Sequence, residues 1–319
     1  MIIVRVSSGL GNQMYQYALL CSLRKKYKDV EIKIDINDYK RNKLHTGYIL
    51  DKIFEIKEEI ANEEECSEAY SKCRYYDGFG KDGLSFQSFR NLYRKIYCKL
   101  GAVRNKRNES HMIYDYKFNI FNPEVFNLDK YKNWYLSGYW QNLRYFDWNK
   151  EELKQVFDFS PNLNSEEMNI LAKIQSCNSV SVHVRKGDYT GSGFDLCGDE
   201  YYYRAIQLMK DKIGECTFFF FSDDANYVKE HFGRIDSAII VSNDVDNLEM
   251  DMFMMGKCNH HIIPNSSFSF WPAYLMENEQ SITVCPQYTL SDGGKMYQAD
   301  YPQNWIRIEN RKGLCDIDE

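Results

Sequence analysis

Residues 179–188 read Ser-Val-Ser-Val-His-Val-Arg-Lys-Gly-Asp and combine residue types that could bind an anion. Alternate side chains of a β-strand share a face, so His183 and Arg185 point one way and the valines the other. An Arg side chain suits a diphosphate, because its planar guanidinium makes two parallel, charge-assisted hydrogen bonds. Beyond Lys186, Asp188 can fold back to hold Arg185 or His183. The pattern indicates either an anion site or a structural Arg–Asp pair at a strand end.

A second segment, residues 7–13, lies between an expected strand and an expected helix. Gly9 and Gly11 would let the backbone approach a ligand closely, and the first N–H groups of the helix would attract an anion. Asn12 and Gln13 follow at the start of that helix. The segment is neither a full G-x-G-x-x-G nor a Walker pattern, so it is weak evidence by itself.

A third segment, Asn265-Ser-Ser-Phe-Ser, follows the apolar strand expected at 260–263. Asn and Ser are favoured helix caps, and they are also donors that could reach a phosphate at a helix N-terminus. Pro272 limits how far upstream a regular helix can start. Asp251 lies on the preceding expected helix, where its carboxylate could accept the two N–H groups of a guanine edge.

Asp244 and Asp246 give a competing signal. They form a D-x-D after the strand expected at 238–242, and such a pair can hold a divalent metal on a nucleotide-sugar diphosphate. The motif is short and common by chance. Because Arg185 already offers charge to a diphosphate, we favour the metal-free interpretation.

The chain around these motifs predicts an α/β fold. Residues 2–6, 13–27 and 31–36 form a β-α-β opening, and 134–139 is a further strand. The region 55–116 is helical in character. Residues 158–164 form a linker, and strands then alternate with helices. Strands are expected at 179–185, 217–221, 238–242, 260–263 and 281–285, and helices at 165–174, 200–212, 224–232 and 247–257 and after Ser267. Alternation of this kind predicts parallel sheets with helices on both faces.

The length of 319 residues fits about two domains. We expect an N-terminal domain of residues 1–160 and a C-terminal domain of residues 161–319, with the last ~20 residues free to pack back on the N-terminal domain. Two such units place a ligand site in the cleft between them, at the carboxyl ends of the strands.

Composition narrows the function classes. The net charge of −6 argues against a general nucleic-acid surface. Ten cysteines without a C-x-x-C pair indicate free thiols in a reducing compartment. No run is long enough for a membrane span, and we expect a cytoplasmic protein. The basic segment 88–108 fits a solvated helix better than a peripheral contact with the inner face of the membrane.

Four motifs together resemble the α-1,2-fucosyltransferases of glycosyltransferase family 11, of the bacterial type. The N-terminal S-G-L-G-N-Q-M-Y-Q-Y-A is similar to the family's G-G-L-G-N-Q-M-F-Q-Y-A. The segments L-S-G-Y-W-Q-N-L-R-Y-F and H-V-R-K-G-D-Y are similar to its Y-W-Q and H-x-R-R-G-D-Y segments. The run from Asp251 to Trp271 resembles its C-x-H-x-I-x-A-N-S-T-F-S-W-W. The order matches, and the resemblance covers most of the chain.

The resemblance implies a GT-B-like fold of two Rossmann-like parallel-sheet domains facing a cleft. The C-terminal domain would bind GDP-fucose and the N-terminal domain would face the acceptor, without a metal. Arg185 would grip the β-phosphate, and His183 would line the donor pocket. Further donor-side residues would be Gly9, Gly11, Asn12, Gln13, Lys186, Asp251, Asn265, Ser266, Ser267 and Phe268, and acceptor-side residues Tyr139, Trp140 and Gln141.

The implied reaction is an inverting transfer of L-fucose to the 2-hydroxyl of a β-galactoside, on an oligosaccharide or a lipid-linked glycan. Asp188 is the first choice for the general base, with a role in holding Arg185 as the alternative. Lys186 stands where the family usually has a second Arg and loses the bidentate fork. Two other functions stay open: a metal-dependent transferase using Asp244 and Asp246, and a glycan-binding protein without catalysis.

Overall fold

The computed structural model describes residues 1–41, 47–70, 110–115, 119–241 and 248–311. The basic segment 88–108 and the carboxylates Asp244 and Asp246 lie outside the described residues. The chain divides into two compact units, Met1–Asn149 and Lys150–Glu319. Each unit is described by itself below.

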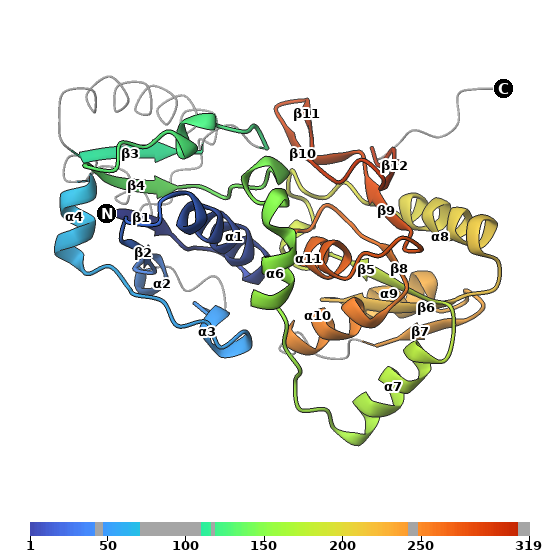
Figure 1. Ribbon diagram of the computed structural model, residues 1–319. Coiled ribbons are helices and arrows are strands. Elements are labelled where there is room, and N and C mark those ends of the chain that lie inside the picture. Colours follow the sequence, from blue (N-terminus) through green and yellow to red (C-terminus); the bar gives the residue numbers. More distant parts are fainter. Residues whose placement is uncertain (42–46, 71–109, 116–118, 242–247, 312–319) are drawn as a thin grey trace. The chain divides into compact units, whose positions relative to one another are not determined.

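Unit 1 is built on a four-stranded parallel sheet in the order β2-β1-β4-β3 (Figure 1). Its strands are β1 (Ile2–Arg5), β2 (Ile32–Asp35), β3 (Ser110–Tyr114) and β4 (Asn133–Ser137). Its helices are α1 (Leu10–Lys26), α2 (Asp38–Arg41), α3 (Leu50–Ile53), α4 (Glu63–Tyr70), η2 (Pro123–Phe126), η3 (Leu143–Tyr145) and η4 (Asp147–Asn149). All strand pairs run parallel, so their carboxyl ends meet at one edge of the sheet.

Two details of unit 1 differ from the sequence predictions. Helix α1 begins at Leu10 rather than at Gln13, because Gly9 takes the extended conformation of an N-cap and the helix continues directly from it. Strand β3 lies in a region predicted to be helical. Its five residues are held by pairing with β4, a tertiary contact that overrides local preference.

Unit 2 contains a six-stranded parallel sheet in the order β12-β9-β8-β5-β6-β7 and a separate antiparallel hairpin (Figure 1). Its strands are β5 (Ser179–Val184), β6 (Thr217–Ser222), β7 (Ala238–Ile240), β8 (His260–Ile262), β9 (Thr283–Pro286), β10 (Tyr288–Asp292), β11 (Lys295–Gln298) and β12 (Ile306–Ile308). Its helices are α6 (Lys150–Val156), α7 (Ser165–Gln175), η5 (Gly187–Tyr189), α8 (Asp199–Ile213), α9 (Ala225–Phe232), α10 (Leu248–Lys257) and α11 (Ser267–Leu275).

Strand β5 lies inside this sheet, between β6 and β8. Val180, Val182 and Val184 pack with α8 and α9 on one face. On the other face, Phe219 and Phe221 of β6 pack with α7 and α10. The alternation expected along β5 is therefore present, and helices cover both faces of the sheet as predicted.

The division between the units falls after Asn149, whereas the sequence places the domain boundary after residue 160. Helix α6 precedes the predicted linker but belongs to unit 2, because Lys150 donates to Glu277 at 2.7 Å and α6 contacts α11. The described part of the C-terminal tail also belongs to unit 2, where β12 pairs with β9.

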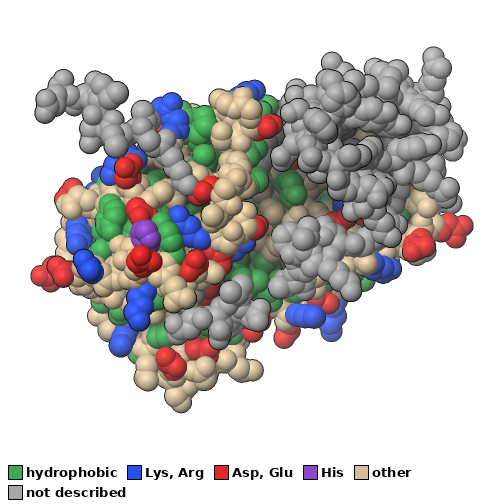
Figure 2. All heavy atoms as spheres, turned by 180° about the vertical axis from the view of Figure 1, so that it is seen from behind, with side chains coloured by type: hydrophobic (Ala, Val, Ile, Leu, Met, Phe, Trp, Pro, Cys, Tyr) green, Lys and Arg blue, Asp and Glu red, His purple; other side chains and the backbone are tan. Residues whose placement is uncertain are grey.

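The distribution of charged side chains and the state of the cysteines can be compared with what the composition indicated. On the face shown in Figure 2, Lys and Arg side chains are interspersed with Asp and Glu over the described residues. The cysteines in the described part of the chain are free thiols. Within those same residues, no helix is long and apolar enough to cross a membrane.

Candidate active site

Arg185 follows β5 directly and is held by two carboxylates. Its Nε and Nη2 donate to Oδ1 of Asp188 at 3.1 and 2.7 Å, and its Nη1 lies 2.9 Å from Oδ2 of Asp223. Asp188 thus folds back onto Arg185, one of the two partners considered for it. The Arg185 side chain stays 29% exposed, so the guanidinium is fixed in direction while the side chain is still partly open to solvent.

Asp223 is missing from the residues proposed from the sequence. It follows β6, which pairs with β5, and its Oδ1 also accepts the backbone N–H of Lys186 at 2.8 Å. A Cβ at Gly187 would lie 2.5 Å from Oδ2 of Asp223, so a larger residue there would displace this carboxylate from Arg185. The sequence does contain a signal for Asp223. The acidic pair Asp223-Asp224 directly follows a buried strand, and neighbouring parallel strands end at the same edge of a sheet.

Lys186 lies over an aromatic side chain on the same edge. Its Nζ is 4.0 Å from the ring centroid of Tyr227, a cation–π arrangement. The Tyr227 hydroxyl donates to Asp199, whose other oxygen lies 2.6 Å from Nδ1 of His231. The ammonium of Lys186 therefore rests on a ring that is itself held in place. Sequence reasoning did not identify Tyr227.

His183 is buried on β5, with its ring 5.7 Å from that of Phe268. Burial, together with the nearby Arg185, lowers the pKa of His183 to about 3. The imidazole is neutral at physiological pH and cannot supply a proton from a charged form. Its Nδ1 has no hydrogen-bond partner among the described residues. His183 is therefore suited to a polar contact without charge.

Helix α11 begins beside this group. Ser266 is its N-cap and accepts the N–H of Phe268 at 3.3 Å, and Ser267 is its first residue. Tyr189, whose ring lies 5.6 Å from the Arg185 guanidinium carbon, donates to the Asn265 carbonyl at 3.3 Å. The Arg185 segment and the N-terminus of α11 thus lie together at one edge of the sheet.

The Asn265 side chain serves the framework. Its Nδ2 donates to the carbonyls of Phe194 and Thr289, both at 2.9 Å, which ties α11 to the loop after β5 and to the β10–β11 hairpin.

Pro272 lies inside α11 rather than limiting its start. Asp251 is half-exposed on α10, which packs against α11, and its guanine-binding role stays a prediction.

This edge can bind a polyanion. Arg185 and Lys186 supply two positive charges, and the N-terminus of α11 adds backbone N–H groups and the positive end of the helix dipole. His183 offers a neutral polar ring nearby. A diphosphate needs such directed donors, and each of them is anchored before the ligand arrives.

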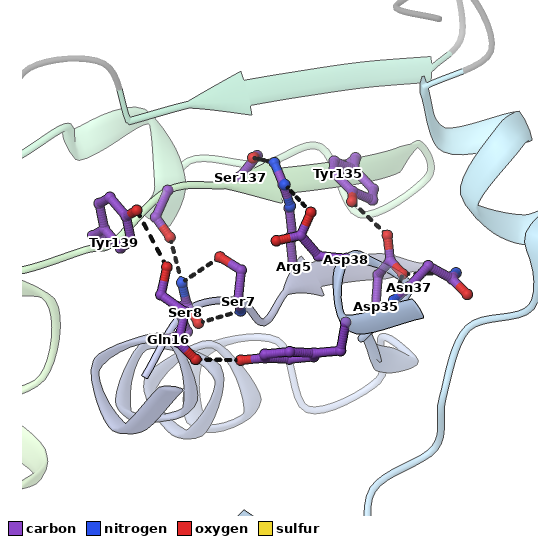
Figure 3. Close-up of polar contacts among 12 residues, drawn as sticks. Arg5, Ser7, Ser8, Gln16, Asp35, Asn37, Asp38, Tyr135, Ser137 and Tyr139 are labelled. Atoms are coloured by element: carbon purple, nitrogen blue, oxygen red, sulfur yellow. Dashed lines mark hydrogen bonds and ion pairs between the residues drawn. The ribbon is translucent and has the colours of Figure 1, made fainter. Parts of the chain in front are cut away.

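The corresponding edge of unit 1 carries the glycine-containing segment (Figure 3). Gly9 is the N-cap of α1, and Gly11 and Asn12 lie in the first turn of the helix. Gln13 is buried. Its Nε2 donates to the carbonyls of Ser8 and Gly47 at 3.0 and 2.8 Å, and its Oε1 accepts the N–H of Ile49 at 3.1 Å. Both polar atoms of the Gln13 amide therefore hold backbone groups of Ser8, Gly47 and Ile49 in place.

The Tyr-Trp-Gln segment follows β4 on the same edge. The Tyr139 ring is 42% exposed, and its hydroxyl lies 3.3 Å from the Ser8 hydroxyl (Figure 3). Gln141 donates to Oδ1 of Asn12 at 2.7 Å. Trp140, in contrast, is fully buried with a φ of 57°, so its ring is part of the core and only its backbone shapes this edge.

Arg5 continues the polar edge at the end of β1. Its guanidinium donates to Asp38 at 2.8 Å and to the Ser137 hydroxyl at 3.3 Å (Figure 3). Asp35 accepts the Tyr135 hydroxyl at 2.6 Å. Hydroxyl, amide and guanidinium groups with one exposed ring suit a sugar better than an apolar ligand.

Metal ligands do not cluster in the described part of the chain: no group of three or more His, Cys, Asp or Glu residues there could hold a metal ion. The D-x-D carboxylates, Asp244 and Asp246, lie outside that part. Their proposed role therefore stays open.

Comparisons with known proteins show which family the chain belongs to. The model of glycosyl transferase family 11 matches residues 92–309, more than half of the chain. An alpha-1,2-colitosyltransferase from Escherichia coli is 31% identical over 323 residues, covering 97% of this chain and 99% of the relative. The O-antigen biosynthesis glycosyltransferase WbnK from the same organism is 26% identical, covering 91% and 95%.

A human galactoside alpha-(1,2)-fucosyltransferase 1 is 25% identical over 191 residues, covering 54% of this chain and 52% of the relative. Among solved structures, the fucosyltransferase NodZ from Bradyrhizobium is similar with a TM-score of 0.47 and 13% identity, covering 94% of this chain and 98% of that one. The family match and the full-length relative agree with the motifs. The chain belongs to glycosyl transferase family 11.

Proposed function

We propose that this glycosyltransferase moves L-fucose from GDP-fucose to the 2-hydroxyl of a β-galactoside in a surface glycan, with inversion at the anomeric carbon. The observation that carries the proposal is the edge of unit 2, where Arg185, Lys186 and the N-terminus of α11 gather. The names of the relatives support an α-1,2 linkage and a galactoside acceptor.

In the proposed reaction, Arg185 and Lys186 balance the negative charge that develops on GDP as it leaves. Asp188 and Asp223 hold the guanidinium in place beforehand, so little reorganisation is needed in the transition state. The N–H groups at the start of α11 add donors for the phosphate oxygens. The neutral His183 lines the donor pocket, and no divalent metal is required.

A second donor is favoured by a specific observation. The relative that matches almost the whole chain is a colitosyltransferase, and colitose is the 3-deoxy form of L-fucose. Both donors would present the same diphosphate to the same cations. The two differ by one hydroxyl, so a site that hydrogen-bonds the 3-hydroxyl would prefer fucose strongly. Rates with GDP-fucose and GDP-colitose, measured side by side, decide between them.

The first experiment measures GDP release from GDP-fucose in excess EDTA, with and without a β-galactoside. Acceptor-dependent release supports a metal-free fucosyltransferase, and NMR of the product fixes the linkage and the anomeric configuration. GDP release that requires Mg²⁺ or Mn²⁺ would instead support a metal-dependent transferase in which Asp244 and Asp246 bind the metal ion. Sugar binding without GDP binding would support a glycan-binding protein instead.

The matched variants are Arg185→Ala and Arg234→Ala, both in unit 2. Arg234 is exposed and follows α9, which ends at Phe232. We expect Arg185→Ala to lose about 10²–10³-fold in kcat, the usual effect of removing one preorganised donor. Arg234→Ala should keep the wild-type rate. Full activity of folded Arg185→Ala would refute the proposed phosphate site.

A further inference from the structure

Asp115 directly follows β3 and lies at the polar edge of unit 1. Its N–H donates to the Ser137 carbonyl at 2.9 Å, which extends the pairing of β3 with β4. A Cβ at Gly138 would lie 2.3 Å from the Asp115 Cβ. Asp115 is thus pressed against the turn that carries Tyr139 and Gln141.

One oxygen of this carboxylate is engaged and the other is available. Oδ2 accepts the backbone N–H of Trp140 at 3.1 Å, which helps to hold that residue at its positive φ. Among the described residues, Oδ1 of Asp115 has no hydrogen-bond partner. A carboxylate with one anchored and one available oxygen has a fixed direction and can still accept a proton.

Few of the described residues around Asp115 are charged. The neighbouring titratable group on η3 is Tyr145, whose hydroxyl accepts the Asn122 N–H at 2.7 Å, and Arg144 of η3 instead faces the Phe121 ring at 4.0 Å. On the adjoining turn, Tyr139 points to Ser8. Burial raises the pKa of Asp115 to about 6, against the opposing effect of the Trp140 N–H.

Asp188, the first choice for the general base, is in a different situation. Its Oδ1 receives two N–H groups from Arg185. This carboxylate is engaged in holding the guanidinium that would bind phosphate. Its structural role is therefore favoured over catalysis.

We propose that Asp115 is a catalytic residue that accepts the proton of the acceptor hydroxyl. This inference rests on the proposed function. The acceptor O2 forms a bond to C1 of the donor sugar while the bond from C1 to the phosphate oxygen breaks, and GDP leaves with that electron pair. The proton of O2 moves to Oδ1 of Asp115. The exposed Tyr139 ring and the amide of Gln141 lie on the same edge, where they would contact the acceptor sugar.

The test uses Asp115→Asn and Asp115→Ala in the full chain. Asn has the shape of Asp and keeps an oxygen for the Trp140 N–H, but it cannot take the proton, whereas Ala loses both functions. The control is Glu124→Gln, an exposed carboxyl on η2 in the same unit. Fucose transfer to a β-galactoside is measured across the pH range, and GDP binding is measured by calorimetry.

We expect wild-type kcat/KM to fall tenfold per pH unit below about pH 6, as Asp115 is protonated. Asp115→Asn should lose about 10²–10⁴-fold in kcat and lose this acidic limb, with unchanged GDP affinity. Glu124→Gln should match the wild type in all three measurements.

A merely structural role predicts a different pattern: Asp115→Asn would be nearly as active as the wild type with the acidic limb intact, and only Asp115→Ala would be impaired. That result overturns the inference alone. A wild-type protein that transfers neither fucose nor colitose to any galactoside overturns the proposed function and the inference with it.

Discussion

Replacing Asp115 by Asn should stabilise the protein at neutral and alkaline pH. The pKa of this carboxyl is about 6 in the folded protein, against 3.8 for an ordinary Asp. Each pKa unit corresponds to about 1.36 kcal/mol, so keeping Asp115 ionised in the fold costs about 3 kcal/mol above pH 6. Asn carries no charge and avoids this cost. The hydrogen bond from the Trp140 N–H is already included in this figure, because it opposes the rise in pKa.

The gain is about 3 kcal/mol, and its dependence on pH has a fixed sign. Because the folded pKa is raised, the wild type recovers stability as the pH falls through 6, and the recovery is complete below 3.8. The advantage of Asp115→Asn should therefore be full above pH 6 and should disappear near pH 4.

The assay is thermal unfolding of both proteins between about pH 4 and pH 8, followed by tryptophan fluorescence and circular dichroism. A gain of about 3 kcal/mol corresponds to a rise in Tm of roughly 6–12 °C for a unit of this size. Glu124→Gln again serves as the control and should show no such difference. An equal Tm for Asp115→Asn and the wild type at every pH would refute the reasoning, because the ionised carboxyl would then carry no burial cost.

Three further variants probe the framework. Gly187→Ala puts a Cβ 2.5 Å from Oδ2 of Asp223, so GDP affinity measured by calorimetry should fall about tenfold, and unchanged affinity would contradict the close contact. Tyr227→Leu removes the ring beneath Lys186 and should weaken GDP binding by about 0.5–2 kcal/mol, whereas Tyr227→Phe should bind nearly as the wild type does; equal loss in both would rule out the ring contact. Gln13→Leu leaves three backbone groups unpaired and should lower the free energy of unfolding in urea by at least about 3 kcal/mol, a loss that an unchanged midpoint would disprove.

The residues that meet at the edge of unit 2 could be predicted because their signals are local, and their role toward a donor stays a prediction. Valines alternate with polar residues along β5, which fixes the face on which His183 and Arg185 lie. The polar run from Asn265 follows a buried strand, and parallel strands end together. Local patterns of this kind predict which residues meet when the strands themselves are clear.

Asp223 and Asp115 were missed for two different physical reasons. Asp223 contacts Arg185 only because β6 pairs with β5, and strand order is a tertiary property. Asp115 follows β3, whose five residues alternate weakly and were predicted to be helical. Gln13 and Trp140 belong to motifs that resemble those of the family. Their side chains are nevertheless buried, where they stabilise the fold.

The hydrogen bonds of Asn265 determine which neighbouring positions can change without loosening α11. Its amide joins three segments that are distant in sequence, and it does so through the main-chain carbonyls of Phe194 and Thr289. Main-chain carbonyls persist when the side chains at those positions change. The loop after β5 and the β10–β11 hairpin could therefore exchange residues, in evolution or in a library, without releasing their attachment to α11. Substitutions at positions flanking these two carbonyls should therefore be tolerated more readily than a substitution of Asn265 itself.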